Sequence, residues 1–187
     1  TDMKPHVMQL KKSNADMVLL WTSVGHAVRI VGTSKAMQFA PQFMSTSTCS
    51  DFPLMMHISK GLWEGVICAT FGLLPDSDNP LMQKYKNEAY GKFAAKGERW
   101  GLFYYAGILL AEPLVEALQR SGRNLTRERL VKELEGIKNF QGIGPKISYS
   151  RFDPNDPNSR QGTRSTYLVK CLKDGKAKQL TTWFDIQ

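Results

Sequence analysis

Hydroxyl side chains follow two apolar runs of strand length, at the point where each run ends. Thr22-Ser23 comes after Asp16–Trp21, and Ser45–Thr48 comes after Pro41–Met44. In an open parallel α/β sheet, ligands bind just beyond the carboxyl ends of the strands, so two neighbouring hydroxyl-rich ends predict half of a small-molecule pocket. Hydroxyl groups can hydrogen-bond a bound molecule, but this pattern contains no activated nucleophile. The expected chemistry is therefore binding and not catalysis.

Each hydroxyl group also has a structural interpretation. Ser23 precedes a predicted helix, Val24–Phe39, so its hydroxyl could cap the first N–H groups of that helix. The N-terminus of such a helix can also hold a carboxylate. The second strand end carries more hydroxyls than one turn requires, which favours ligand binding by Ser45, Thr46, Ser47 and Thr48.

The sequence lacks the motifs of common catalytic and metal-binding sites. His26 and His57 have no second ligand at metal-binding spacing, and the three cysteines, Cys49, Cys68 and Cys171, form no C-x-x-C pair. Those within strand patterns are expected to be buried thiols. The chain contains no Gly-x-Ser-x-Gly elbow and no glycine-rich phosphate loop. We therefore expect no metal, no cofactor and no enzyme activity.

Aromatic residues gather at the start of a long predicted helix, Trp100–Gly122. Such a group, here Trp100, Phe103, Tyr104 and Tyr105, more often belongs to a core than to a ligand site. Trp100 differs because it follows the polar segment Lys96–Arg99 and so stands at the mouth of the packed face. We expect it to contact a ligand.

The elements that position these residues alternate between helix and strand. The first part predicts a helix ending near Asn14, the strand–helix–strand unit, a short helix over Asp51–Ser59 with Pro53 in its first turn, and a third strand in Leu62–Phe71. We expect the strand Asp16–Trp21 to be buried. Three strands with intervening helices indicate a parallel sheet.

The pattern changes after Phe71 to a Gly- and Pro-rich connection followed by helices. The predicted elements are the helices Asn79–Ala95, Trp100–Gly122 with Pro113 inside it, and Thr126–Leu134, a turn and strand in Gly142–Tyr149, a polar loop over Arg151–Arg164, and strands in Thr166–Leu172 and Ala177–Phe184. Asp174-Gly175 joins the last two runs as a hairpin.

Composition restricts the remaining classes of function. The 187 residues are 42% hydrophobic, enough for an ordinary core, and no apolar run approaches the about 18 residues that cross a bilayer. The net charge of +8 is dispersed along the chain, which is typical of a solvated surface and not of nucleic-acid binding. The chain begins at Thr1 without an initiator Met, so we expect a processed or partial chain, its signal peptide removed.

The order of several short motifs resembles a periplasmic solute-binding protein of the branched-chain amino acid (leucine/isoleucine/valine) type, the type 1 receptors of ATP-binding-cassette (ABC) importers. The resemblance covers nearly the whole chain. It rests on Val7–Lys12 with Ala15–Trp21, Ala27–Val31 with Pro41–Ser45, Gly61–Val66, Tyr105–Gly107 with Leu114–Gly122, Gly144–Ser148, and Tyr167–Lys170 with Lys173–Lys176.

The resemblance implies the C-terminal half of a two-lobed α/β protein with the type 1 periplasmic-binding (Venus flytrap) fold, a parallel sheet flanked by helices. By similarity, residues 1–68 form a βαβ portion of the second lobe, residues 69–148 form a helical portion of the first, and residues 149–187 cross the hinge to a C-terminal second-lobe hairpin. The implied partners are a small-molecule ligand, an ABC importer membrane permease and the missing N-terminal half. The implied location is periplasmic or extracytoplasmic, secreted or lipid-anchored.

The resemblance also suggests roles for three side chains. Ser23 matches a second-lobe residue that closes over the ligand, and Trp100 matches a first-lobe position that often carries a ring. Ser47 stands where amino acid binders often present an acid to the ammonium group, which shifts the expected ligand toward an uncharged or anionic molecule such as an aromatic acid. A ligand-sensing domain of a receptor or regulator remains the alternative. A small hydrolase or transferase and a basic nucleic-acid-binding domain fit the motifs less well.

Overall fold

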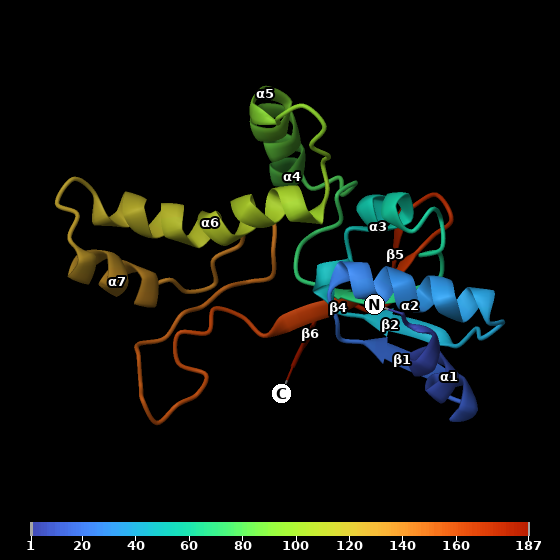
Figure 1. Ribbon diagram of the computed structural model, residues 1–187. Helices are drawn as coiled ribbons and strands as arrows, with labels where there is room; N and C mark the ends of the chain where they lie inside the picture. The colour runs from blue at the N-terminus through green and yellow to red at the C-terminus, as the bar shows by residue number, and fades with distance from the viewer. Residues whose placement is uncertain (1, 187) are drawn as a thin grey trace. The chain divides into compact units, whose positions relative to one another are not determined.

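The computed structural model describes residues 2–186, which divide into two compact units (Figure 1). Within the described residues, unit 1 consists of residues 2–70 and 167–182, and unit 2 consists of residues 71–166 and 183–186. The chain therefore passes from one unit to the other three times. Among the described residues, no helix has the length and apolar character needed to span a lipid bilayer.

The sheet of unit 1 has the strand order β1-β2-β3-β4-β5. The first three strands are parallel and the last two are antiparallel, which confirms the predicted parallel unit and the closing hairpin. The strands are β1 (Met17–Leu20), β2 (Gln42–Ser45), β3 (Ile67–Thr70), β4 (Ser165–Cys171) and β5 (Ala177–Gln179). Gly175 supplies the positive φ of 78° that the hairpin turn requires.

The third strand is shorter than predicted, because the chain turns before it. Lys60, Gly61 and Gly65 have φ values of 53°, 86° and 84°, which extended backbone does not adopt. Trp63 lies within this turn and is fully buried. The apolar run that predicted a strand from Leu62 onward therefore includes a buried turn, and β3 begins only at Ile67.

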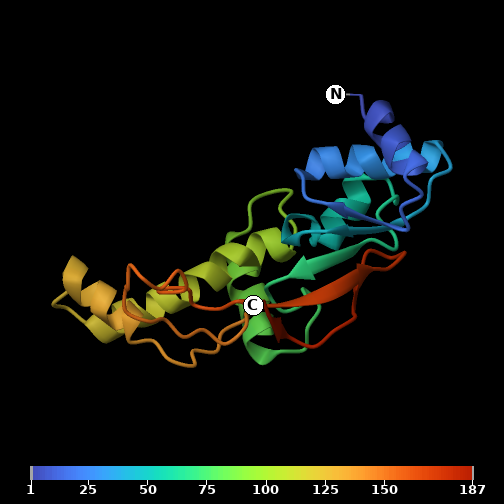
Figure 2. The same cartoon turned by 90° about the horizontal axis from the view of Figure 1, so that it is seen from below.

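The helices of unit 1 are α1 (Lys4–Lys12), α2 (Val24–Ala36), the short 3-10 turn η1 (Ser47–Cys49) and α3 (Phe52–Ile58). The predicted helices are confirmed, and α2 buries Ala27 and Val31. The Asp51 carboxylate caps α3 by accepting from Leu54 N at 3.3 Å. Helices α1 and α2 contact each other and lie along one side of β1 (Figure 2).

One face of β1 is open to solvent. Val18 and Leu20 are buried, but Met17, Leu19 and Trp21 are 55%, 61% and 83% exposed. The prediction of a buried strand is therefore wrong for this face, because strand side chains alternate and no described element covers the second side.

Unit 2 contains mainly helices. They are α4 (Pro80–Tyr85), the π-helical segment η2 (Lys86–Tyr90), α5 (Gly91–Phe93), α6 (Leu102–Ser121) and α7 (Arg127–Glu135); the strand β6 (Phe184–Asp185) pairs with the start of β4. The predicted helices are confirmed, and the Thr126 hydroxyl caps α7 by accepting from Arg129 N at 3.2 Å. The core consists of Met82, Leu102, Tyr105, Leu109 and Ile143.

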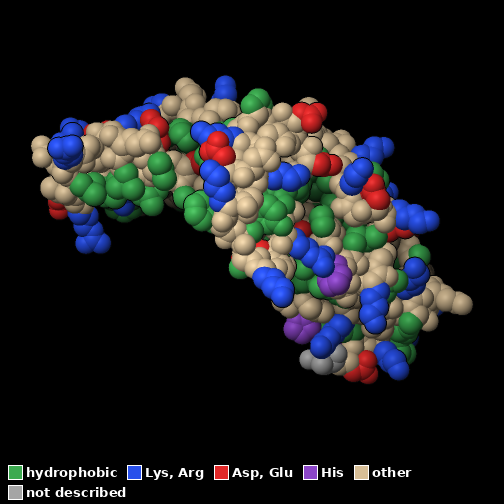
Figure 3. Space-filling view, turned by 90° about the horizontal axis from the view of Figure 1, so that it is seen from above, with side chains coloured by type: hydrophobic (Ala, Val, Ile, Leu, Met, Phe, Trp, Pro, Cys, Tyr) green, Lys and Arg blue, Asp and Glu red, His purple; other side chains and the backbone are tan. Residues whose placement is uncertain are grey.

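Helix α6 also keeps an apolar stripe on its solvent side. Phe103, Leu110, Leu114 and Leu118 are 49%, 69%, 41% and 37% exposed, at the spacing of one helix face. Exposed hydrophobic side chains are visible over α6 and α7 in Figure 3. Unit 2, like unit 1, thus has an apolar face without a covering element among the described residues.

The strand predicted within Gly142–Tyr149 is wrong, since only an isolated bridge joins Phe140 and Ile147. The backbone here is bound to other segments instead. Ile143 N donates to Glu112 Oε2 at 2.9 Å, and Ile143 O accepts from Leu73 N at 2.9 Å. These bonds hold the segment as a turn in the core of unit 2.

Glu112 is the buried acid that holds this turn. Its Oε1 accepts from Tyr85 Oη at 3.1 Å, and burial raises the pKa of its carboxyl above the usual range. A Cβ added to Gly142 would lie 1.9 Å from Glu112 Oε2. Position 142 therefore accepts only glycine while Glu112 keeps this conformation.

Candidate functional site

The hydroxyl-rich ends of β1 and β2 lie side by side in unit 1. The two strands are parallel and in register, with Leu20 opposite Ser45. Ser45 is 3% exposed, and its Oγ donates to Leu20 O at 3.1 Å. This serine therefore joins the two strand ends, and the segments that follow them start from one edge of the sheet.

Ser23 occupies the N-cap position of α2, but its side chain does not cap the helix. Its Oγ lies 2.8 Å from His26 Nδ1, so the predicted capping bond is replaced by a bond to a ring nitrogen. The first backbone hydrogen bond of α2 is Ala27 N to Ser23 O at 2.9 Å. No side chain within residues 2–186 caps the N–H groups before Ala27, which suits an anionic group.

His26 and Gly25 extend this end of α2. Both are exposed, and a Cβ added to Gly25 would meet no atom within 4 Å. His26 can donate or accept a hydrogen bond at this edge, according to its tautomer. We did not expect His26 in the site, although its position three residues after an N-cap serine is the spacing of a capping box.

The segment after β2 holds the remaining predicted residues. Thr46 Oγ1 and Thr48 Oγ1 lie 2.8 Å apart, and Ser50 Oγ donates to Ser47 O at 2.8 Å. The Ser47 hydroxyl forms no hydrogen bond to another residue in the described part of the chain, and Thr48 is exposed. Unit 1 thus brings Ser23 and Ser45–Thr48 to one sheet edge as predicted, while their role in binding stays a prediction.

Trp21 is a further candidate that sequence reasoning missed. It directly follows β1, precedes Thr22-Ser23, and is 83% exposed. The apolar run Asp16–Trp21 predicts that it belongs to a buried strand. The available signal was the alternation along β1, which places Trp21 on the same face as Met17 and Leu19.

Trp100 lies in unit 2, where it is half-buried next to the core. Its Nε1 donates to Pro75 O at 2.9 Å, and its ring centroid lies 5.7, 5.9 and 5.5 Å from those of Tyr90, Tyr104 and Tyr105. Helix α6 begins at Leu102, so Trp100 precedes the helix. This aromatic cluster fixes the ring, and its contact with a ligand stays a prediction.

The cysteines are structural. Cys49, Cys68 and Cys171 are all buried free thiols. Burial is the main cause that raises the pKa of Cys171 to about 12, and it raises the pKa of Cys68 as well. A thiol with a raised pKa is a poor nucleophile and a poor metal ligand. Among residues 2–186, no three His, Cys, Asp or Glu side chains are grouped closely enough to hold a metal ion.

Comparison with known proteins gives one family match. The family model described as "Periplasmic binding protein" matches residues 1–176. No curated protein sequence gives a significant match.

Solved structures share the fold at low sequence identity. A fatty acid ABC transporter substrate-binding protein from Thermomonospora curvata has a TM-score of 0.80 and 24% identity, over 100% of this chain and 47% of its own. A branched chain amino acid ABC transporter from Thermus thermophilus, with bound valine, has a TM-score of 0.81 and 16% identity, over 99% of this chain and 50% of its own. A leucine binding protein from Thermotoga maritima has a TM-score of 0.76 and 17% identity, over 98% and 49%. The chain thus spans about half the length of these structures.

Proposed function

Because the chain belongs to the periplasmic binding protein family, we propose that it is part of the extracytoplasmic substrate-binding protein of an ABC importer. The family and its structural neighbours are solute-binding proteins, not enzymes. Two of these neighbours are ABC transporter proteins, which supports the proposal of an importer and its membrane permease as partners.

In this proposal unit 1 belongs to the second lobe and unit 2 to the first lobe of a two-lobed receptor. The two compact units and the three passages of the chain between them support this assignment. We propose Ser23 and Ser45–Thr48 as the solute contacts that unit 1 supplies, and Trp100 as a contact that unit 2 supplies. Binding then favours a closed state, because a ligand shifts an equilibrium by its difference in affinity for the two states.

We propose that the solute is a small organic molecule with a carboxylate or another anionic group, such as an aromatic acid. The observation that carries this proposal is the N-terminus of α2, whose first N–H groups lie next to the Ser23 and His26 side chains and are capped by no side chain in the part of the chain that the structure describes. Such an end attracts negative charge. Residues 22–26 and 45–50 include no Asp or Glu, so these two segments supply no acid for an ammonium group. The exposed Trp21 offers a ring at the same edge.

A thermal-shift screen of the full-length protein against amino acids, aromatic acids, fatty acids and their amides tests the proposal. An acid that binds only the folded protein should stabilise it by about 2.7 kcal/mol at a hundredfold excess over its Kd. The matching amide should have little effect, since it lacks the charge. Mass analysis of the recovered ligand checks that the protein has not changed it chemically. Turnover of the ligand, or a preference for amides over acids, would contradict the proposal.

A further inference from the structure

A groove runs along one face of α7 in unit 2. Arg127, Val131 and Glu135 follow one another at helical spacing, and Glu128 and Lys132 lie beside them. Together with Gly136 and Arg151 they line an open cavity of about 780 Å³. A second cavity of about 300 Å³ shares Val131 and Glu135 and is completed by Leu134, Tyr149 and Arg160. We refer to both together as the α7 groove.

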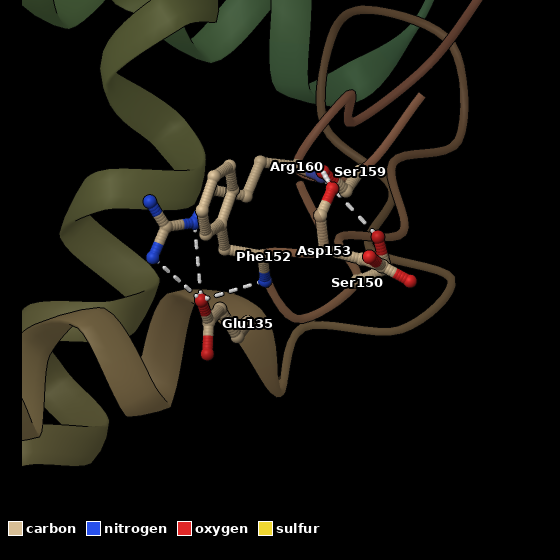
Figure 4. Close-up of polar contacts among 6 residues, drawn as sticks. All are labelled: Glu135, Ser150, Phe152, Asp153, Ser159 and Arg160. Atoms are coloured by element: carbon tan, nitrogen blue, oxygen red, sulfur yellow. Dashed lines mark hydrogen bonds and ion pairs between the residues drawn. The ribbon is translucent and has the colours of Figure 1, made fainter. Parts of the chain in front are cut away.

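The far wall of the α7 groove is the polar loop after Tyr149, and Glu135 anchors this loop to the helix (Figure 4). Arg160 Nη2 and Nε donate to Glu135 Oε1 at 2.8 and 3.1 Å, and Phe152 N donates to the same oxygen at 3.2 Å. The Arg160 guanidinium also lies 4.9 Å from the centre of the Phe152 ring. Further along the loop, Ser159 Oγ donates to Asp153 O at 3.0 Å. These hydrogen bonds hold the loop in place against α7.

The ion pair between Arg160 and Glu135 determines which charges of the groove remain uncompensated. The bond from Arg160 is the main cause that lowers the pKa of Glu135, so this carboxylate stays ionised and its charge is compensated by its partner. Arg127, Lys132 and Arg151 are exposed, and none of them forms an ion pair within 4.0 Å in residues 2–186. Glu128 is the one other carboxylate in the lining. The groove therefore presents an excess of positive charge around the partly exposed Val131.

We propose that the α7 groove binds an acidic polypeptide segment of a partner protein. Its open form suits an extended segment, and its three cations complement carboxylates on that segment. Val131 and the stem of Lys132 offer apolar contact between the charges. A nucleic-acid backbone fits less well, because the Glu128 carboxylate interrupts the positive charge and would repel a continuous row of phosphates. This inference does not depend on the identity of the solute.

Fluorescence anisotropy with a labelled Glu-Ser repeat peptide tests the proposal on the full-length protein at low and at physiological salt. The wild type should bind the peptide, with an affinity that falls as salt rises. The triple variant Arg127→Glu/Lys132→Glu/Arg151→Glu should bind it at least about tenfold more weakly, since rim charges govern such an encounter. The matched control is Lys84→Glu/Lys92→Glu/Lys96→Glu, which changes the net charge equally on exposed residues of the same unit and should retain wild-type affinity.

A second pair of variants leaves the three cations in place. Arg160→Gln removes the partner of Glu135 and so exposes its negative charge to the groove; binding should weaken several-fold. The double variant Arg160→Gln/Glu135→Gln removes both charges and should restore most of the affinity. Equal loss in the Lys84 control, a double variant as weak as Arg160→Gln, equal binding of a Gln-Ser peptide, tighter binding of a DNA oligonucleotide, or full displacement by millimolar inorganic phosphate would overturn the proposal.

Discussion

Ser45 Oγ donates a hydrogen bond of 3.1 Å to the carbonyl oxygen of Leu20, and so the last residues of β1 and β2 are joined by a side chain as well as by the sheet. Ser45 is buried, which makes this bond difficult for water to replace. The bond fixes the relative position of the two segments that carry Ser23 and Ser47. Its removal should therefore affect both stability and the geometry of the site.

Replacing Ser45 with alanine should lower the free energy of unfolding by about 1–3 kcal/mol, because Leu20 O then loses a buried partner. Urea denaturation of the variant and the wild type measures this difference. Ser50→Ala is a suitable control, since Ser50 Oγ also donates to a backbone carbonyl, that of Ser47, but is only half-buried. Equal losses in both variants would show that the position of Ser45 between the strands has no special effect.

Ser47→Glu tests the charge of the proposed ligand. A carboxylate at this position should weaken the binding of an anionic solute about tenfold or more, which corresponds to about 1.4 kcal/mol, through repulsion near the end of α2. Calorimetric titration with the acid found in the thermal-shift screen provides the measurement. The same change at the exposed Gln9 of α1 should leave the affinity as it is. Tighter binding by Ser47→Glu would instead indicate a ligand with a positive group.

Trp100→Ala tests the contribution of unit 2 to binding. If the ring contacts the solute, its loss should cost about 1–3 kcal/mol of binding free energy. Trp100→Phe retains an aromatic ring but loses the bond to Pro75 O, so it separates ring contact from loop position. Phe103→Ala removes another aromatic side chain close by and should not change the affinity. The prediction fails if Trp100→Ala binds the solute as the wild type does while its melting temperature alone falls.

Glu112 should make stability depend on pH in a particular direction. Burial raises the pKa of its carboxyl in the folded state, so the folded protein holds the proton more tightly than the unfolded chain. The stabilising contribution is therefore complete below the ordinary carboxyl pKa and is lost as pH rises through the raised pKa of the folded state. Glu112→Gln does not titrate and should lack this dependence. Denaturation of both proteins over a series of pH values measures it, and parallel curves would contradict the assignment.

The two exposed apolar faces should control the association of these 187 residues. Leu19 and Leu110 are 61% and 69% exposed, and each lies in a row of other exposed apolar side chains. Contiguous exposed apolar surface of this kind is uncommon in a monomer. Produced alone, the chain should therefore associate with itself through these faces. Leu19→Gln/Leu110→Gln should increase the monomer fraction in light scattering. A cooperative, monomeric wild type of unchanged size at high concentration would refute this prediction.

Local signals predicted most of the elements, because each has its own cause in the sequence. Thr126 marks the start of one helix and Pro53 the first turn of another, Asp174-Gly175 makes the hairpin, and alternating helices and strands predict the parallel sheet. The errors depend on distant contacts. Glu112 binds Ile143 across 31 positions of the chain and prevents a strand there, and the exposure of Leu19 depends on what covers the sheet. No local sequence pattern indicates the bond between Glu112 and Ile143 or the exposure of Leu19.

For the candidate site, the sequence predicted the position of the segments but not the direction of their side chains. The strand ends predicted that Ser23 and Ser45–Thr48 lie at one edge of the sheet, because that edge follows from the strand order alone, and their role in binding stays a prediction. The strand order does not reveal the direction of each hydroxyl group. In the structure, the Ser45 hydroxyl bonds to Leu20 O and the Ser23 hydroxyl to His26 Nδ1. Trp21 was missed because an apolar run does not reveal which of its two faces is covered.

The placement of unit 2 between β3 and β4 determines the order in which the sheet can form. Thr70 of β3 pairs with Tyr167 of β4, and the whole helical part of unit 2 lies between them in sequence. A ribosome therefore releases β1, β2 and β3 well before their remaining neighbours exist. Closing so long a segment is slow and has a high entropic cost, which is smaller once the intervening residues have folded into a compact body. During synthesis, the edge of β3 is left unpaired until β4 emerges, and a chaperone that shields it would protect the nascent chain from aggregation.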